Sequence, residues 1–401
     1  MVQQLQPPPP AQTPGGQGDG WRQLMTYQPA APVPDNATRR PVIRRILLWG
    51  VVLTVFGLAA LAMGGIVTAS VGVTAATLAL VTATLALGIV VPVFLWVDRL
   101  EPEPTRLLWF AFLWGALIST LGAILLNEAG MAFFAGLHTD PMFVGAVIVA
   151  PLTEEFLKCL GVLLIFFRAR REFNGVTDGI VYAGIVAAGF AFVENIIYLA
   201  NALVEFGTPG LVGLFVMRCL VSPFAHPMFT VCFGLALGLV AHNRRWSSLW
   251  IVVTGFAMAV FLHALWNYSA VAAAEAYLLI FAVVQIPLFI GFILLLRWAR
   301  RRESRILRDL LTGYGINGWY TPGEVAMIAD PAERRHARKW ARSIGGSRAE
   351  KAMQAFQDES GELAMVRKHI INEGPDADWL GREQALLQAV TTHRRVFVPG
   401  I

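Results

Sequence analysis

The stretch Pro151-Leu-Thr-Glu154-Glu155-Phe-Leu-Lys158 lies inside a long apolar run, residues 142–167. An ionisable side chain at the centre of a bilayer costs roughly 2.5–3.5 kcal/mol on insertion scales, so such groups rarely face lipid. Lys158 follows Glu154 by one helical turn and lies on nearly the same face as Glu155, so it can offset a carboxylate. A buried ion pair that only locks helix packing is the plainer interpretation, but it leaves the second carboxylate as a costly addition. We therefore expect a polar pocket within a membrane-embedded bundle.

The composition supports a multi-spanning membrane protein. Of the 401 residues, 56% are hydrophobic and only 15% are charged, which excludes an ordinary soluble globule. A bilayer-crossing helix needs about 20 apolar residues. About eight runs meet this need, and they predict an all-α polytopic helix bundle with spans at 46–68, 73–97, 107–129, 142–167, 178–201, 211–241, 248–270 and 275–297. Pro223 and Pro227 interrupt the sixth run, so a broken or re-entrant helix is the alternative there.

The positions of the arginines predict the orientation. In an eight-span path they gather on one side, and the loops of the other side, near 69–72, 130–141, 202–210 and 271–274, contain no Lys or Arg. The positive-inside rule then places both termini in the cytoplasm of a cell-membrane protein. Because these arginines flank the spans, the net charge of +5 does not indicate nucleic-acid binding.

Three regions follow from these patterns. Residues 1–45 are rich in Pro and Gly and predict a disordered cytoplasmic tail, and residues 46–300 form the transmembrane domain. Residues 301–401 predict a small soluble helical module in the cytoplasm, with helical spacing in 331–357, 359–371 and 381–391. Thr321 is a candidate cap for another helix, with Pro322 at its first position. We favour packing over a regulatory role for this module.

Further polar residues lie in the next three spans. The fifth span carries Glu194 and Asn195, and the sixth carries Arg218 and His226. The seventh carries His263 and, one turn later, Asn267, which can orient the imidazole or bind a substrate carbonyl. When the spans run in alternating directions, Glu154, Glu194, His226 and His263 fall at comparable depth. A lone buried histidine is usually a packing residue, but two at the depth of three carboxylates predict a shared site.

The residue types in this pocket favour a metal. Two imidazoles and a carboxylate are a common ligand set for catalytic zinc. Three glutamates face only Lys158 and Arg218, and a divalent ion would compensate the remaining negative charge. A zinc-bound water has a pKa near neutrality, and a nearby glutamate can take its proton, as amide hydrolysis requires. Adjacent side chains on a helix point about 100° apart, so Glu154 and Glu155 cannot play equal parts. We slightly prefer Glu154 as the base.

Five motifs together resemble the PrsW intramembrane proteases, which are related to the CAAX prenyl endopeptidases. They occur in order on successive spans, and the similarity runs from the loop at 100–104 to the eighth span. The motifs are the EEFLK stretch at 154–158, DGIVYAG at 178–184, the Phe190 to Asn195 segment, the Arg218 to His226 segment, and His263 with Trp266-Asn267.

The resemblance implies a metal-dependent protease that cuts a membrane-associated protein, with anti-sigma factors as one known substrate type. By motif, Glu154 and Glu155 would be the catalytic glutamates, and His226 and His263 would be metal ligands, with Glu194 completing the set. Glu194 stands where the prenyl enzymes have histidine, and a transmembrane substrate is favoured over a prenylated one. The remaining motif residues would contribute to catalysis, namely Lys158, Arg218 and Asn267, or support the site, namely Asp178 and Asn195.

Two other classes of function stay open. Intramembrane carboxylates and histidines also build proton relays and transporters, although the inverted repeats typical of many transporters are not evident here. A catalytically silent protein that binds its substrate on a protease scaffold is the other alternative.

Overall fold

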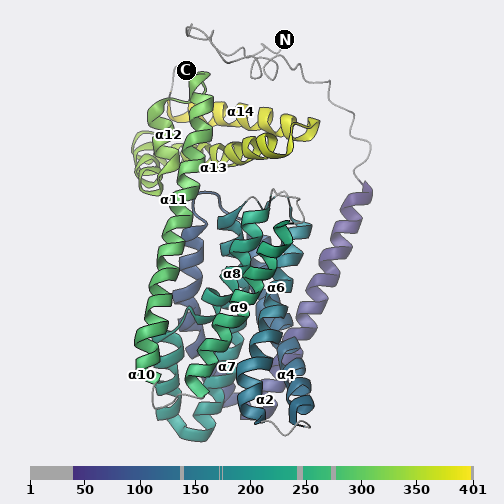
Figure 1. The fold of residues 1–401 in the computed structure, drawn as a ribbon. Coiled ribbons are helices and arrows are strands. Elements are labelled where there is room, and N and C mark those ends of the chain that lie inside the picture. The colour runs from purple at the N-terminus through teal and green to yellow at the C-terminus, as the bar shows by residue number, and fades with distance from the viewer. Residues whose placement is uncertain are drawn as a thin grey trace. The chain divides into compact units, whose positions relative to one another are not determined.

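The structure, a computed structural model, describes residues 39–135, 140–170, 172–173, 175–241, 247–271 and 277–398. Within these ranges the chain forms helices and no strand, as Figure 1 shows, so the predicted all-α fold is confirmed. Most of the predicted tail, residues 1–38, lies outside the described residues. The first helix, α2, begins at Arg39, within the region that the sequence assigned to that tail.

Contacts divide the chain into two compact units, one of which runs from Trp49 to Arg301. Its first helix is α2 (Arg39–Val97), whose 59 residues would extend about 90 Å if straight, three times the thickness of a bilayer core. Gly72 divides α2 into two arms, with a φ of 80° that residues with a side chain rarely adopt. Gly207, with a φ of 66°, divides α7 (Val176–Phe215) in the same way. The two arms of α2 correspond to the first two predicted spans.

The other elements of this unit coincide with the remaining predicted spans. Several include a short π-helical stretch, labelled η, which continues directly into the neighbouring α-helix. The elements are α3 (Thr105–Leu113), η1 (Trp114–Ser119), α4 (Thr120–Ala135), α5 (Pro141–Val144), η2 (Gly145–Val149), α6 (Ala150–Arg168), η3 (Val216–Val221), α8 (Ala225–Val240), α9 (Ser247–Val271), α10 (Tyr277–Ile280), η5 (Phe281–Gln285) and α11 (Ile286–Ile316).

The segment 211–241 is a broken helix, which was the alternative interpretation of that run. Helical geometry ends after Val221, and Ser222 and Phe224 have non-helical backbone angles before α8 begins at Ala225. Pro223 lies at this break, where a proline cannot donate the hydrogen bond that a continuing helix needs. The break places His226 in the first turn of α8.

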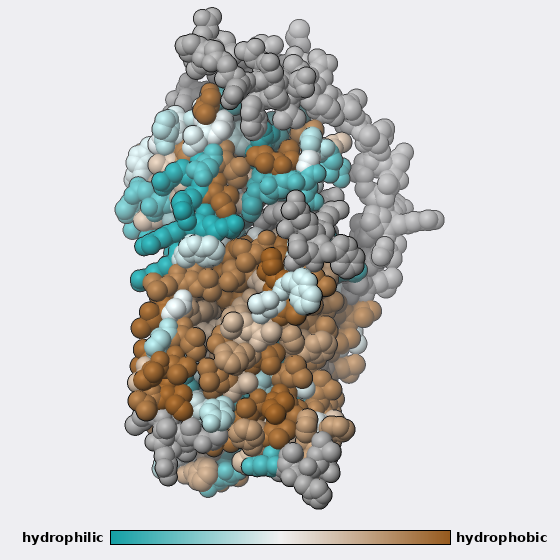
Figure 2. Space-filling model, viewed as in Figure 1, coloured by the Kyte–Doolittle hydropathy of each residue, from teal (hydrophilic) through white to brown (hydrophobic). Residues whose placement is uncertain are grey.

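Five helical stretches of the described residues are long and apolar enough to cross a membrane, by length and composition. Figure 2 shows apolar residues over most of the visible surface of this unit. Helix α6 is not among the five, because its 19 residues include Glu154, Glu155, Lys158 and Arg168. The helix that carries the paired glutamates is therefore more polar than a typical membrane-crossing helix.

Helices α7 and α8 approach each other backbone to backbone. A Cβ added to Gly234 would lie 2.0 Å from the carbonyl oxygen of Gly179, and one on Gly179 would lie 2.0 Å from that of Gly234. Only glycine permits such an approach, which is a common device where helices pack in membranes. The pair forms the centre of the unit, since Val176–Phe190 is buried throughout.

The second unit contains the helices that follow Arg302, and it has its own core around Leu307, Ile328 and Phe356. Thr321 caps α12 (Pro322–Ala329): its hydroxyl accepts from the Glu324 amide, and the Glu324 carboxylate accepts from the Thr321 amide. The remaining helices are α13 (Pro331–Glu373) and α14 (Ala377–Phe397). The sequence placed a boundary between two helical segments at residue 358, but the chain is helical there. The break in α13 lies instead at Gly345 and Gly346.

Candidate active site

In the unit Trp49–Arg301, hereafter the membrane unit, both carboxylate oxygens of Glu155 accept hydrogen bonds. Its Oε1 accepts from Lys158 Nζ at 2.7 Å and from His263 Nδ1 at 3.0 Å, and its Oε2 accepts from Thr230 Oγ1 at 2.8 Å. The side chain is completely buried. A buried carboxylate needs such donors, because removal from water is otherwise very unfavourable. Glu155 therefore joins α6, α8 and α9 through one carboxylate.

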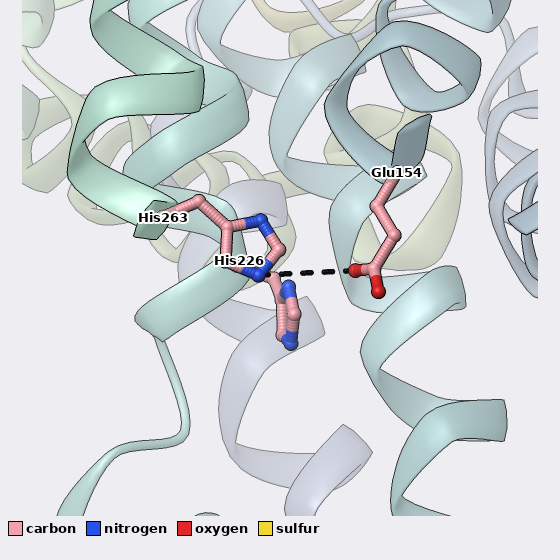
Figure 3. A group of neighbouring side chains, drawn as sticks. All are labelled: Glu154, His226 and His263. Carbon is pink, nitrogen blue, oxygen red and sulfur yellow. Dashed lines mark ion pairs between the residues drawn. The ribbon is translucent and has the colours of Figure 1, made fainter. Parts of the chain in front are cut away.

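Glu154, its neighbour in sequence, has a different environment. It is buried, yet its Oε2 has no hydrogen-bond partner. This oxygen lies 3.8 Å from His263 Nε2 and 3.7 Å from Lys158 Nζ, and both distances are beyond hydrogen-bond length. Figure 3 shows the Glu154 carboxylate and the His263 ring facing each other across this gap. A buried acceptor without a donor is uncommon and requires an explanation, such as a bound water or ion.

His226 connects the two ends of the cluster. Its Nδ1 lies 3.2 Å from Lys158 Nζ and its Nε2 lies 2.7 Å from Glu194 Oε2. The lysine can only donate, so Nδ1 is the accepting nitrogen and Nε2 donates to the glutamate. The His226 and His263 rings are nearly perpendicular, with centroids 5.1 Å apart.

Glu194 and its partners form the outer part of the cluster. Arg218 forms an ion pair with Glu194, and its Nε donates to Asn195 Oδ1 at 2.9 Å. The guanidinium also lies over the Tyr198 ring, 4.3 Å from its centroid. Glu194 and Asn195 of α7 thus hold Arg218 of η3, and Glu194 in turn contacts His226.

Two of the expected site residues bond elsewhere. Asn267 donates from Nδ2 to the carbonyl oxygen of Ala146 at 2.8 Å, so it connects α9 to η2. Asp178 lies at the start of α7, where its Oδ2 accepts from the Gly175 amide at 2.9 Å. Asp178 precedes Glu194 by 16 residues on α7, which is between four and five helical turns. In this structure Asp178 caps a helix, and Asn267 bridges two segments.

Two residues of the cluster, Thr230 and Phe229, were not identified from the sequence, and a third, Phe190, was noted only as the start of a motif. Thr230 donates to Glu155, and Phe229 stacks on His263 with centroids 5.0 Å apart. The Phe190 ring lies 4.0 Å from Lys158 Nζ, in cation–π geometry. Apolar and hydroxyl residues are common in every span, so no local pattern distinguishes Thr230 and Phe229 from lipid-facing or packing residues.

The cluster has the composition of a metal site. Glu154, His226 and His263 each offer a ligand atom, all within 4.8 Å of one another, and Figure 3 shows these side chains converging from α6, α8 and α9. The sequence had placed Glu194 in that set, whereas the structure brings Glu154 beside both imidazoles. Three carboxylates face the cations Lys158 and Arg218, so one negative charge remains. The unpartnered Oε2 of Glu154 and this charge both fit a cation or the water that it holds.

Comparisons with known proteins agree with this geometry. The profile of the PrsW family intramembrane metalloproteases matches residues 103–292. The chain is 31% identical to Protease PrsW of Geobacillus kaustophilus over 44% of its own length and 72% of the relative's. It is 27% identical to Protease PrsW of Oceanobacillus iheyensis, over 51% of its own length and 87% of the relative's. No solved structure matches the chain. The matched residues contain the whole cluster of α6 to α9, and the chain belongs to the PrsW family of intramembrane metalloproteases.

Proposed function

We propose that the chain hydrolyses a peptide bond of a membrane-associated protein. The reaction centre in this proposal lies beside the side chains of Glu154 and His263. The observation that carries this proposal is the contrast between the two adjacent glutamates. Glu155 is saturated by donors, whereas Glu154 Oε2 is buried without one, 3.8 Å from His263 Nε2. The two atoms are too far apart for a direct hydrogen bond, and a water that contacts both of them from one side could give its proton to Glu154.

Neighbouring residues orient the His263 imidazole so that Nε2 is available at the proposed reaction centre. When His263 Nδ1 donates to Glu155, the lone pair of the neutral imidazole is on Nε2, the nitrogen that faces Glu154. Lys158 balances the charge of Glu155 without occupying Nε2. We assign to Glu154 the role of proton acceptor from the attacking water.

Zinc is the proposed cofactor. It would be held by His226, His263 and one carboxylate. Two carboxylates are candidates: Glu194 lies 2.7 Å from His226, and Glu154 lies beside both rings. When bound, zinc supplies a water whose pKa is close to neutral and a Lewis acid for the peptide carbonyl. A carboxylate that orients a ligating imidazole through its other nitrogen, as Glu155 does, is the usual support for such a ligand.

The position of the site favours a transmembrane substrate. His226 and His263 lie within the helical stretches Val176–Val240 and Ser248–Val271, which are long and apolar enough to cross a bilayer, and both side chains are buried. A substrate must therefore bring its peptide bond to membrane depth. We propose a membrane protein as the substrate, for example an anti-sigma factor in regulated signalling.

Both termini are proposed to be cytoplasmic, because the arginine-rich loops of the eight-span path lie on their side. Reporter fusions at Gly18 and Ile401 should both read cytoplasmic. A C-terminus outside the cell would mean an odd number of spans. The alternating directions that place Glu154, Glu194, His226 and His263 at comparable depth would then be wrong.

The central test uses purified protein and membranes from cells that express it. We expect about one zinc per wild-type chain and an emptied site in His263→Ala with helicity unchanged. Chelation should stop the release of membrane-protein fragments that wild type produces and Glu154→Gln does not. If the active protein contains no divalent metal and chelators do not reduce its activity, the zinc proposal is wrong. Peptide hydrolysis by the glutamates alone would then take its place. Ion or solute transport in liposomes without any cleavage would favour the transporter alternative, and substrate capture without cleavage by wild type would favour the silent scaffold.

A further inference from the structure

Thr230 is completely buried in α8, one turn after His226. Its hydroxyl lies 2.8 Å from Glu155 Oε2 and 3.2 Å from the carbonyl oxygen of His226. A threonine hydroxyl has a single proton, and in a helix this proton usually goes to the carbonyl one turn back. Here the shorter contact is with Glu155, so the hydroxyl donates across to α6.

This bond fixes the orientation of the Glu155 carboxylate. Oε1 already receives Lys158 and His263, and Thr230 supplies the donor at Oε2. With both oxygens held, the plane of the carboxylate cannot rotate about its last torsion without breaking a hydrogen bond. The position of Oε1 then determines which nitrogen of His263 carries the proton.

We propose that Thr230 is a positioning residue of the peptidase, which holds Glu155 so that His263 keeps its proton on Nδ1 and presents the Nε2 lone pair to the reaction centre. It acts through Glu155 and does not touch the reacting atoms. This inference rests on the proposed function, in which His263 works through Nε2. It adds a residue that lies outside the motifs of the sequence.

Activity measurements on three variants give the first test. Thr230→Val keeps the shape and removes the hydroxyl, Thr230→Ser keeps the hydroxyl, and Thr254→Val is the matched control. Thr254 is exposed on α9 and donates only to its own helix, to the Trp250 carbonyl at 2.7 Å. We expect Thr230→Val to lower kcat by about 10- to 100-fold, the usual effect of losing such a supporting contact, with KM unchanged. Thr230→Ser should restore kcat to within about threefold, and Thr254→Val should equal wild type.

Nitrogen-15 spectra of histidine-labelled, metal-free protein give a second test that does not depend on hydrolysis. The His263 signal, assigned by its absence in His263→Ala, should show a protonated Nδ1 in wild type and a mixture of tautomers in Thr230→Val. Thr230→Ala replaces the valine variant in both experiments if that variant does not fold.

The two proposals fail in different ways. Full activity of His263→Ala overturns the proposed function. Wild-type kcat in Thr230→Val, a loss confined to KM, no recovery in Thr230→Ser, or an unchanged His263 tautomer overturns the role of Thr230 while the peptidase stands.

Discussion

Two ion pairs, one from each unit of the molecule, have opposite environments. Lys158 and Glu155 of the membrane unit have no exposed side-chain surface. Arg342 and Glu350 of the C-terminal unit are 69% and 33% exposed. Water solvates the second pair whether or not the partners meet. In the first pair each member depends on the other, and in addition Glu155 bonds to His263 and Thr230 and Lys158 bonds to His226. The comparison teaches that an ion pair constrains this fold only where it is part of a buried network.

The largest expected effect comes from breaking the buried network. Lys158→Met leaves the Glu155 charge buried without its cation, which should lower the free energy of unfolding by about 3–5 kcal/mol. The matched change in the exposed pair, Arg342→Met, should lower it by less than about 1 kcal/mol. Unfolding by denaturing detergent, followed by circular dichroism, measures both. Equal losses of unfolding free energy in the two variants would contradict the distinction between the buried and the exposed ion pair.

The second prediction compares the adjacent glutamates. Glu154→Gln should lower the turnover of a membrane substrate by about 10²-fold or more, the usual contribution of positioned proton transfer, and leave zinc and folding intact. Glu155→Gln should instead reduce stability or metal affinity, because its carboxylate holds Lys158, His263 and Thr230. Metal content, turnover and thermal unfolding of the purified variants separate these outcomes. Zinc lost from Glu154→Gln would make Glu154 a ligand, and wild-type rates in both variants would refute the mechanism.

An intermediate case lies at the edge of the cluster. The Arg218 side chain is 24% exposed and pairs with Glu194, which contacts His226. Arg218→Gln should lower activity by about 10- to 100-fold, as expected for a group that supports a site residue, and should destabilise the protein less than Lys158→Met. The same unfolding and cleavage assays test this order. A loss of stability as large as that of Lys158→Met would place Arg218 in the buried network.

The smallest effect is expected in the C-terminal unit. Thr321→Ala removes the cap of α12 and should lower stability by about 1 kcal/mol, with no change in peptide hydrolysis. Thr312→Ala is the control, since Thr312 is exposed on α11 and its hydroxyl bonds only to the Arg308 carbonyl. Thermal unfolding of the full chain, followed by a probe in the C-terminal unit, detects the difference. A marked loss of hydrolysis in Thr321→Ala would show that the module affects the reaction.

Hydropathy and proline positions were sufficient to predict much of the fold. The apolar runs correspond to helical segments, and the two prolines of 211–241 pointed to the alternative that the structure adopts. Helix ends that lie within polar sequence were harder to predict. Helix α11 continues to Ile316, beyond the predicted end at 297, because a soluble helix can follow a membrane helix without a change of backbone geometry.

The site was predictable in its residue types and less so in its contacts. Comparable depth along the spans predicted one site for Glu154, Glu194, His226 and His263. The structure groups Glu154 with both histidines, and Glu194 contacts His226 at 2.7 Å. Depth cannot say which way a side chain points around its helix, and this angle directs Asn267 to the Ala146 carbonyl and Glu194 to Arg218. Thr230 escaped prediction for the same reason: threonines such as Thr77 and Thr82 bond to their own helix, and only tertiary packing distinguishes Thr230.

The contact between Gly179 and Gly234 affects how a mutational scan of this protein would read. Any side chain at either position must separate α7 from α8, the helices that carry Glu194 and His226. A selection that scores only activity would therefore rank these glycines with the reacting residues, although they bear no functional group. A parallel score for the amount of folded protein separates the two classes, since Glu154→Gln should accumulate normally and Gly234→Val should not.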